Sequence, residues 1–214
     1  MNDLSNYRKS YEKSELLESN IPEDPINLFH RWFHEVKEFG GIEEVNAMTV
    51  ATIGMDGFPK ARVVLFKKYD ENGFIFYTNY NSEKGKAILH NPNICLSFFW
   101  HSLERQVIIK GIAEKTDDSV SDNYFASRPD GSKLGAIVSN QSEVIPDRTF
   151  LEKQLKTLES ETEGKEILRP NHWGGFLIRP IAIEFWQGRP NRLHDRIRYT
   201  LQADYTWQID RLAP

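Results

Sequence analysis

The sequence contains a single cysteine, Cys95, so an intramolecular disulfide cannot form. The chain therefore depends on its core for stability, as proteins of a reducing compartment do. Cys95 lies in the apolar run from Ile94 to Trp100, where we expect a small core residue rather than a nucleophile. A cytoplasmic location is the corresponding expectation.

Long apolar runs and a basic excess are also missing. No run approaches the roughly 20 residues of a membrane-spanning helix, and residues 1–19 are charged and unlike a secretory signal peptide. The 27 Lys and Arg residues stand against 31 Asp and Glu residues, which gives a net charge of −4. General nucleic-acid-binding proteins carry a basic excess. We therefore expect neither a nucleic-acid nor a membrane partner.

Several signatures of chemistry are absent. The glycine-rich dinucleotide fingerprint and the Walker A loop do not occur, and no local pattern indicates a Ser-His-Asp triad. His30 and His34 are spaced for one helix face and could share a metal ion, but no third ligand follows at a useful spacing. A solvated helix edge is the expected role of this pair, and no metal site is predicted.

The elements that are present predict a mainly β protein with peripheral helices. Residues 1–22 are polar and predicted to be a flexible N-terminal segment, and residues 23–214 are predicted to be a single domain. Helices are expected over 25–39, 83–90, 117–127, 132–140 and 147–161, and the first of them has Asp24 as its cap and Gly40 as its stop. Strands are expected over 47–53, 60–68, 74–78, 94–100, 106–114, 175–178, 182–186, 196–201 and 207–209. Strands linked mostly by hairpins favour an antiparallel barrel with covering helices over a parallel nucleotide-binding sheet.

Basic residues stand inside the predicted strands of this acidic protein. In an extended chain Arg192, His194 and Arg196 point to one face. Three cation-capable groups on one face repel one another unless an anion lies among them. The alternative is a strand whose charges face water.

Two further basic segments have the same two interpretations. Arg62 and Lys67 flank an apolar stretch, and their odd spacing predicts opposite faces of one strand, either toward a ligand or at solvent-exposed strand ends. Lys84 opens a short helix, where free N–H groups favour a phosphate. A lysine there is mildly unfavourable for the bare helix, which points weakly to a bound anion.

Tyr124, Arg128 and Ser132 follow one another at four-residue steps. Pro129 and Gly131 interrupt the helix, so we expect the three side chains to converge around a helix end. A phenol, a guanidinium and a hydroxyl together suit a phosphate, although an ordinary helix terminus would have the same residues. Trp186 could stack on a planar cofactor or belong to the core.

Taken together, these segments resemble the pyridoxamine 5′-phosphate oxidase family, from about Tyr7 to Pro214. The motifs that carry the resemblance are 62–67 (RVVLFK), 76–79 (FYTN), 103–107 (LERQV), 124–129 (YFASRP), 140–142 (NQS), 173–176 (WGGF), 184–188 (EFWQG), 192–196 (RLHDR) and 210–214 (DRLAP). Each motif is weak alone, and their order along the chain makes the set specific.

The resemblance implies an FMN-binding split barrel that forms a homodimer, with FMN bound between subunits. It implies that the FMN phosphate and ribityl chain contact Arg62, Thr78, Lys84, Gln141 and Ser142. It implies that the flavin is lined by Val63, Val64, Leu65, Tyr77, Gln106, Trp186 and Arg196. The substrate phosphate is expected at Lys67, Tyr124, Arg128 and Ser132, with Lys67 also counted among the cofactor contacts.

The resemblance also implies the chemistry. Arg192 and His194 are expected as the catalytic pair over the pyridine ring, and Arg8 and Tyr11 belong to an N-terminal segment that can fold over the site. The expected reaction oxidises pyridoxamine or pyridoxine 5′-phosphate to pyridoxal 5′-phosphate and reduces O2 to H2O2. The alternatives are a binding protein for FMN or a B6 vitamer without turnover, and an oligonucleotide-binding barrel, which the acidic charge disfavours.

One position departs from the family. The family often has arginine where this chain has Glu83. A carboxylate facing a flavin phosphate would weaken binding. We therefore expect Glu83 to turn to solvent, with Lys84 or Lys86 supplying the charge.

Overall fold

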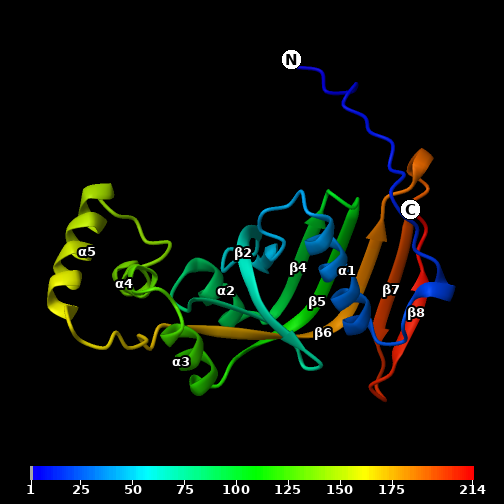
Figure 1. Ribbon diagram of the computed structural model, residues 1–214. Helices are drawn as coiled ribbons and strands as arrows, with labels where there is room; N and C mark the ends of the chain where they lie inside the picture. Colours follow the sequence, from blue (N-terminus) through cyan, green and yellow to red (C-terminus); the bar gives the residue numbers. More distant parts are fainter. Residues whose placement is uncertain (1) are drawn as a thin grey trace. The chain divides into compact units, whose positions relative to one another are not determined.

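Eight strands form one sheet that closes on itself in the computed structural model, which describes residues 2–214 (Figure 1). The hydrogen-bonded order is β3-β2-β1-β4-β5-β6-β7-β8, and β3 also pairs with β6. Six strands therefore make a closed barrel, and β7 and β8 extend the sheet beyond β6. The strands are β1 (Ala47–Ile53), β2 (Pro59–Asp70), β3 (Gly73–Asn79), β4 (Asn93–Trp100), β5 (Arg105–Lys115), β6 (Trp173–Gln187), β7 (Asp195–Leu201) and β8 (Trp207–Arg211). The predicted mainly β barrel is confirmed.

The helices also lie where the sequence predicts them. They are α1 (Pro25–Phe39), α2 (Glu83–His90), α3 (Asp118–Ala126), α4 (Asp130–Val138) and α5 (Arg148–Thr162), with short 3-10 turns at Glu18–Asn20 and Pro190–Arg192. Asp24 caps α1 by accepting a hydrogen bond from the Ile26 N–H at 2.8 Å, and Gly40 ends it at a φ of 75°. None of the helices within residues 2–214 is both long and apolar enough to cross a bilayer.

One strand prediction is wrong. The strands expected over 175–178 and 182–186 are one continuous strand, β6. The strand contains Pro180, which lacks the N–H that a ladder uses. In the structure β6 pairs with β3 as far as Ile178 and with β7 from Ala182 onward. Pro180 lies between these two ladders and interrupts neither of them.

The chain divides into two compact units. The first contains residues up to Val50, Cys95–Gly111 and Pro180–Pro214, and the second contains Ala51–Ile94 and Ile112–Arg179. The single domain predicted for residues 23–214 and the flexibility predicted for residues 1–22 stay predictions. Of the latter segment, Met1 lies outside the described residues.

The first unit is built around the apolar face of α1. Phe29 is fully buried, with its ring centre 5.2 Å from that of Phe98, and Trp32 lies edge-on to Phe185 at 5.2 Å. Burial of each such side chain contributes about 1.5–3 kcal/mol. Beside Trp32, the buried guanidinium of Arg105 pairs with Glu35. Cys95 is half-buried, and burial raises the pKa of its thiol.

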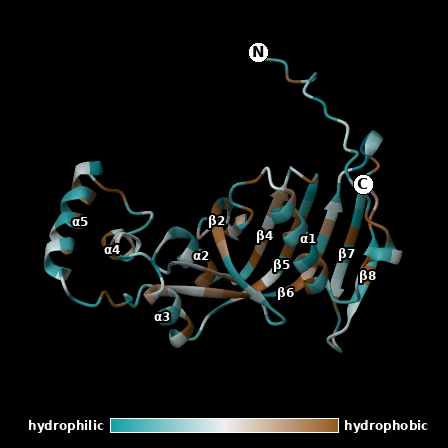
Figure 2. Cartoon of the chain, in the orientation of Figure 1, coloured by the Kyte–Doolittle hydropathy of each residue, from teal (hydrophilic) through white to brown (hydrophobic). Residues whose placement is uncertain are grey.

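The second unit has its core where β3 and β6 meet. Phe76 pairs with Phe176 across the two strands, and both side chains are buried. By contrast, α5 has no buried residue and is mostly hydrophilic in Figure 2. The core side chains of this unit therefore come from the strands and the shorter helices, which also position the candidate site.

Candidate functional site

A cavity of about 660 Å³ opens in the second unit. Residues from β2, β3, α2, α3, α4 and the start of β6 line it, together with the loop after α4. Among its lining residues are these predicted site residues: Val63, Val64, Leu65, Lys67, Tyr77, Thr78, Lys84, Tyr124, Arg128, Ser132 and Gln141. Segments that lie apart in the sequence thus contribute to one cavity.

Lys84 provides the positive charge at one end of this set. Its ammonium donates hydrogen bonds to Gln141 Oε1 at 2.8 Å and to Thr78 Oγ1 at 3.2 Å, both of which are neutral acceptors. Burial, and secondly the nearby Arg62, lower the pKa of Lys84 to about 8, while Glu83 opposes the shift. A half-buried cation with neutral partners is suited to receive an anion.

Local hydrogen bonds explain why Lys84 stands at this position. Ser82 caps α2 by accepting from the Gly85 N–H at 3.1 Å, and its hydroxyl donates to the Asn79 carbonyl at 2.6 Å. A side chain at Gly85 would bring its Cβ to 2.3 Å from the Tyr80 carbonyl oxygen, so the tight approach of α2 to β3 requires glycine there. As predicted, Lys84 lies in the first turn of a short helix.

Arg128 provides the charge among a second set of residues in the same cavity. α3 ends at Ala126 and α4 begins at Asp130, so Tyr124, Arg128 and Ser132 converge at a helix junction, as predicted. The Arg128 guanidinium lies 4.6 Å from the ring centre of Trp173, and burial lowers its pKa. Its Nη1 is buried and has no hydrogen-bond partner among the described residues.

Three nearly parallel rings support this junction. The ring centres of Tyr77 and Tyr124 are 3.8 Å apart with 12° between their planes, and the Trp173 ring lies 5.7 Å from that of Tyr77 at 8°. Trp173 lines the cavity but was not among the predicted site residues. Its place in the WGGF motif was the signal available in the sequence.

A second cavity, of about 640 Å³, lies in the first unit. It collects four of the predicted residues: Arg8, Tyr11, Arg192 and His194. The Arg189 N–H donates to His194 Nδ1 at 3.1 Å. Burial lowers the pKa of His194, and the charge of Arg192 lowers it further, whereas the charge of Asp195 opposes this shift. The Trp186 ring lies 4.7 Å from that of His194.

The extended conformation predicted for Arg192–Arg196 is wrong at its start. Asn191 and Arg192 have φ values of 57° and 61°, and β7 begins only at Asp195. Alternation of faces requires extended backbone, so it does not apply to Arg192. Arg196 in turn is paired with Glu184 at 2.8 Å. A carboxylate of the chain itself, rather than a ligand, therefore neutralises that cation.

Other predicted residues lie outside the two cavities. Arg62 donates to Thr52 Oγ1 at 2.7 Å and does not line the second-unit cavity, whereas Lys67 does. Their predicted opposite faces stay a prediction. Ser142 is exposed with a φ of 78°. Predicted residues of the first unit that do not line its cavity are Gln106, Trp186 and Arg196.

Glu83 is half-exposed and forms an ion pair with Lys60. Its carboxylate is therefore at the surface and partly neutralised, as the expected turn toward solvent requires. Lys86 is exposed, whereas Lys84 lines the cavity, so Lys84 is the one of the two lysines placed to supply the charge. His30 and His34 have ring centres 4.3 Å apart, and no group of three metal-ligating side chains exists within residues 2–214.

Residues 33–161 match the family described as pyridoxamine 5′-phosphate oxidase, and residues 173–214 match the pyridoxine 5′-phosphate oxidase C-terminal dimerisation region. A relative from Flavobacterium johnsoniae named pyridoxine/pyridoxamine 5′-phosphate oxidase is 77% identical over 213 residues, with 100% of both chains covered. The chain belongs to the pyridoxamine 5′-phosphate oxidase family.

Other relatives are similar to this chain over nearly its whole length. The pyridoxine/pyridoxamine 5′-phosphate oxidase of Microcystis aeruginosa is 50% identical, with 99% of this chain and 98% of the relative covered. The solved structure of PhzG from Burkholderia lata, in complex with tetrahydrophenazine-1-carboxylic acid, has a TM-score of 0.87 at 27% identity and covers 95% of this chain and 100% of that one. The chain is thus an oxidoreductase of this family with the family's barrel fold.

Proposed function

We propose that this chain is an FMN-dependent oxidase that converts pyridoxamine or pyridoxine 5′-phosphate to pyridoxal 5′-phosphate and reduces O2 to H2O2. One cavity of the second unit supports the proposal, because it combines two separate cationic groupings. Lys84 with Thr78 forms one, and Arg128 with Tyr124 forms the other. A cofactor and a substrate that each carry a phosphate require two such groupings.

The residues around Lys84 fit the phosphate of FMN. A dianion beside the ammonium would offset the burial that lowers its pKa, and the Thr78 and Gln141 side chains can also donate to phosphate oxygens. Val63, Val64 and Leu65 add an apolar wall suited to a flavin ring. When bound, FMN supplies the two-electron acceptor for the oxidation.

The residues around Arg128 fit the phosphate of the substrate. The unpartnered Nη1 of Arg128 is a buried donor that a phosphate oxygen would satisfy. Tyr124 adds a hydroxyl, and Ser132 adds a second hydroxyl from the first turn of α4. Anchoring the phosphate fixes the rest of the substrate, which is the proximity effect that an oxidation of this kind needs.

Arg192 and His194 are proposed to orient the pyridine ring and its reacting substituent. Both belong to the region that matches the C-terminal dimerisation segment, and we propose the homodimer as the active form. His194 favours its neutral form, because burial and Arg192 lower its pKa. Because His194 Nδ1 accepts from the Arg189 N–H, the neutral imidazole carries its proton on Nε2, so His194 and Arg192 can both donate hydrogen bonds to the substrate.

Oxygen consumption tests the proposal directly. The purified protein, with and without added FMN, is mixed with each phosphorylated vitamer, and O2 uptake, H2O2 and the aldehyde product are measured. We expect a yellow protein that forms equal amounts of H2O2 and aldehyde. A protein that binds FMN but consumes no oxygen with either vitamer would indicate a binding protein without turnover. Failure to bind FMN at all would refute the cofactor assignment.

A further inference from the structure

We infer that Glu104 is a positioning residue for the oxidation: its buried carboxylate fixes the N-terminal strap, defined as residues 9–18, so that Tyr11 lies against Trp186 and His194. The inference rests on the proposed function and extends it to a residue that touches neither cavity. It concerns contacts within the first unit alone.

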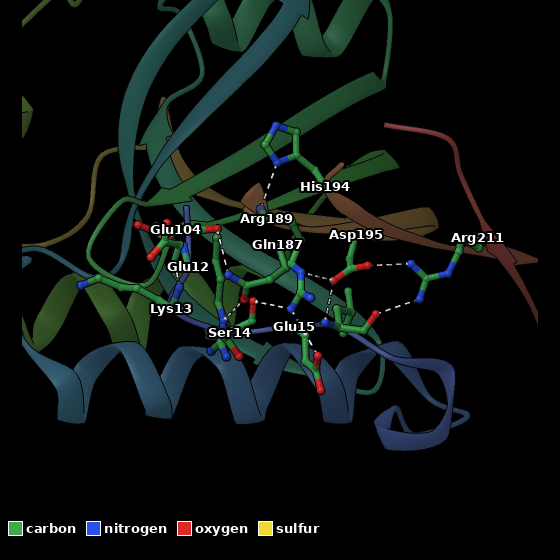
Figure 3. Close-up of polar contacts among 12 residues, drawn as sticks. Glu12, Lys13, Ser14, Glu15, Glu104, Gln187, Arg189, His194, Asp195 and Arg211 are labelled. Atoms are coloured by element: carbon green, nitrogen blue, oxygen red, sulfur yellow. Dashed lines mark hydrogen bonds and ion pairs between the residues drawn. The ribbon is translucent and has the colours of Figure 1, made fainter. Parts of the chain in front are cut away.

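The Glu104 carboxylate binds only to the strap in the hydrogen bonds and ion pairs of the described residues. Oε2 accepts from the N–H groups of Glu12 at 2.9 Å and Lys13 at 3.1 Å (Figure 3). Oε1 pairs with the Lys9 ammonium at 3.1 Å. The residue is 2% exposed. A buried carboxylate is costly unless it is paired and hydrogen-bonded, so strap and carboxylate stabilise each other.

The backbone around Glu104 aims its side chain at the strap. Glu104 stands immediately before β5 with a φ of 58°, and its carbonyl accepts from the Gly188 N–H at 2.8 Å. Gln187 Nε2 donates to the same carbonyl at 3.3 Å. The end of β6 therefore holds the main chain of Glu104 independently of the carboxylate.

The strap contains no strand and only a 3-10 turn at its end. Its backbone groups therefore bond to side chains or to water. Asp195 accepts from the Leu16 N–H at 3.0 Å, and Arg211 donates to the Leu16 carbonyl at 2.8 Å (Figure 3). These anchors hold the strap beyond residue 13. Its first part is held by the Glu104 carboxylate and by the Lys13 ammonium, which donates to the Ser102 carbonyl at 2.7 Å.

Tyr11 lies between the residues that Glu104 holds, Lys9 and Glu12. Its ring centre is 5.7 Å from that of Trp186, edge-on, and 5.8 Å from that of His194. A Cβ at Gly188 would lie 2.8 Å from Tyr11 Cβ, so the tyrosine rests directly on the glycine backbone. Arg8, next to Lys9, lines the same cavity as Arg192 and His194.

Glu104 therefore acts on the reaction through Tyr11 and Arg8 rather than by contact with a ligand. Loss of its carboxylate removes the contacts that hold Lys9 and the backbone of Glu12 and Lys13, so residues 9–13 become looser, while Asp195 and Arg211 still hold Leu16. The expected effect is a higher KM for the phosphorylated substrate with little change in FMN affinity, because the residues proposed for the FMN phosphate belong to the second unit.

The test compares Glu104→Ala, Glu104→Gln and Gly188→Ala with a control, Glu18→Gln, in the FMN-loaded protein. The control removes an ion pair of Arg211 at the far end of the strap. Tryptic cleavage after Lys9 and Lys13 is followed by mass spectrometry, and KM, kcat and FMN affinity are measured on the same samples. Glutamine can still accept from two N–H groups but cannot pair with Lys9.

We expect Glu104→Ala to speed cleavage at least tenfold and to raise KM at least tenfold, with kcat and FMN affinity changed less than threefold. The cleavage rate and KM of Glu104→Gln should lie between those of Glu104→Ala and those of the native protein. Gly188→Ala displaces Tyr11 directly and should raise KM by a similar factor. The control should match the native protein in both measurements. If Glu104→Ala does not fold, Glu104→Gln and Gly188→Ala decide the question alone.

Unchanged cleavage rates and KM values in the Glu104 variants would overturn the inference. A parallel loss of kcat, FMN affinity and melting temperature would also overturn it, because that pattern indicates a merely structural role. The native protein separates this failure from that of the proposed function. If it consumes no oxygen with either vitamer, the proposed function fails, and the cleavage rates still report whether Glu104 holds the strap.

Discussion

The guanidinium of Arg128 lies 4.6 Å from the ring centre of Trp173 and keeps one buried nitrogen without a hydrogen-bond partner within residues 2–214. An aromatic face attracts a cation without using its N–H donors. Trp173 thus holds Arg128 in place while leaving the donor available for an anion.

Trp173→Leu should therefore weaken capture of the substrate phosphate. Loss of a partly desolvated cation–π contact costs about 1–2 kcal/mol, which corresponds to a roughly 5- to 30-fold higher Kd for pyridoxal 5′-phosphate. Calorimetric titration of the FMN-loaded variant measures this, with unphosphorylated pyridoxal as the matched control ligand. An equal loss for both ligands would mean that the tryptophan contacts the ring rather than acting through Arg128.

FMN affinity should depend on pH through Lys84. Its pKa of about 8 in the free protein means that the ammonium is charged below pH 8 and neutral above it. A bound phosphate dianion favours the charged form, so affinity should fall as pH rises from 8 to 9.5, by at most about tenfold per pH unit. Fluorescence titration of the apoprotein checks this. Lys84→Arg should flatten the profile, and a flat native profile would contradict the assignment.

Glu83 and Lys60 should affect FMN affinity in opposite directions. Both side chains are about half exposed, so their ion pair adds about 0–1 kcal/mol to stability. Lys60→Met leaves the Glu83 carboxylate unneutralised and should weaken FMN binding roughly 2- to 5-fold. Glu83→Gln should tighten it by a similar factor. The double variant should return to the native FMN affinity in apoprotein titrations. A weaker FMN affinity of Glu83→Gln would instead show that Glu83 itself contacts the cofactor.

Arg192→Ala should lower turnover far more than FMN retention. The exposed Arg192 lines the first-unit cavity beside His194, and loss of an orienting contact costs on the order of 100-fold in kcat. FMN affinity should change less than about threefold, since the residues proposed for its phosphate lie elsewhere. Leu193→Ala, at a neighbouring side chain that is 67% exposed, serves as the control. Equal losses of turnover and FMN affinity would refute the proposed role of Arg192.

The Arg105–Glu35 pair should matter for stability rather than for catalysis. Arg105 is 6% exposed, donates to Gln187 at 2.9 Å and pairs with Glu35. Glu35→Ala removes the carboxylate that compensates this buried cation. Since Glu35 itself is 42% exposed, the free energy of unfolding should fall by about 1–3 kcal/mol rather than by the larger loss typical of a fully buried pair.

Urea denaturation at saturating FMN measures this difference. Glu152→Ala, which removes the exposed i,i+4 pair of α5, is the matched control and should cost less than about 0.5 kcal/mol. Equal effects of the two substitutions would show that water, rather than Glu35, compensates the Arg105 charge.

Local signals in the sequence predicted most of the elements. The helical spacing after Asp24 and the stop at Gly40 act within a few residues, so α1 was found with nearly correct bounds, and the short helix α2 was also found. The division of β6 into two predicted strands was wrong, because the continuity of β6 depends on its partner strands: the missing N–H of Pro180 would matter only where a ladder uses it. The convergence of Tyr124, Arg128 and Ser132 was predictable from Pro129 and Gly131, which lie between them.

By itself, the sequence determined the strand and helix types, the acidic charge and the family, because propensity, periodicity and ordered motifs are properties of short segments. Only the tertiary structure decided that β3 pairs with β6, that Trp173 stacks beside Arg128, and that Glu104 meets Lys9 and Glu12 across more than 90 residues. Such contacts depend on how distant segments are brought together and on which buried groups lack water, and no local pattern encodes either.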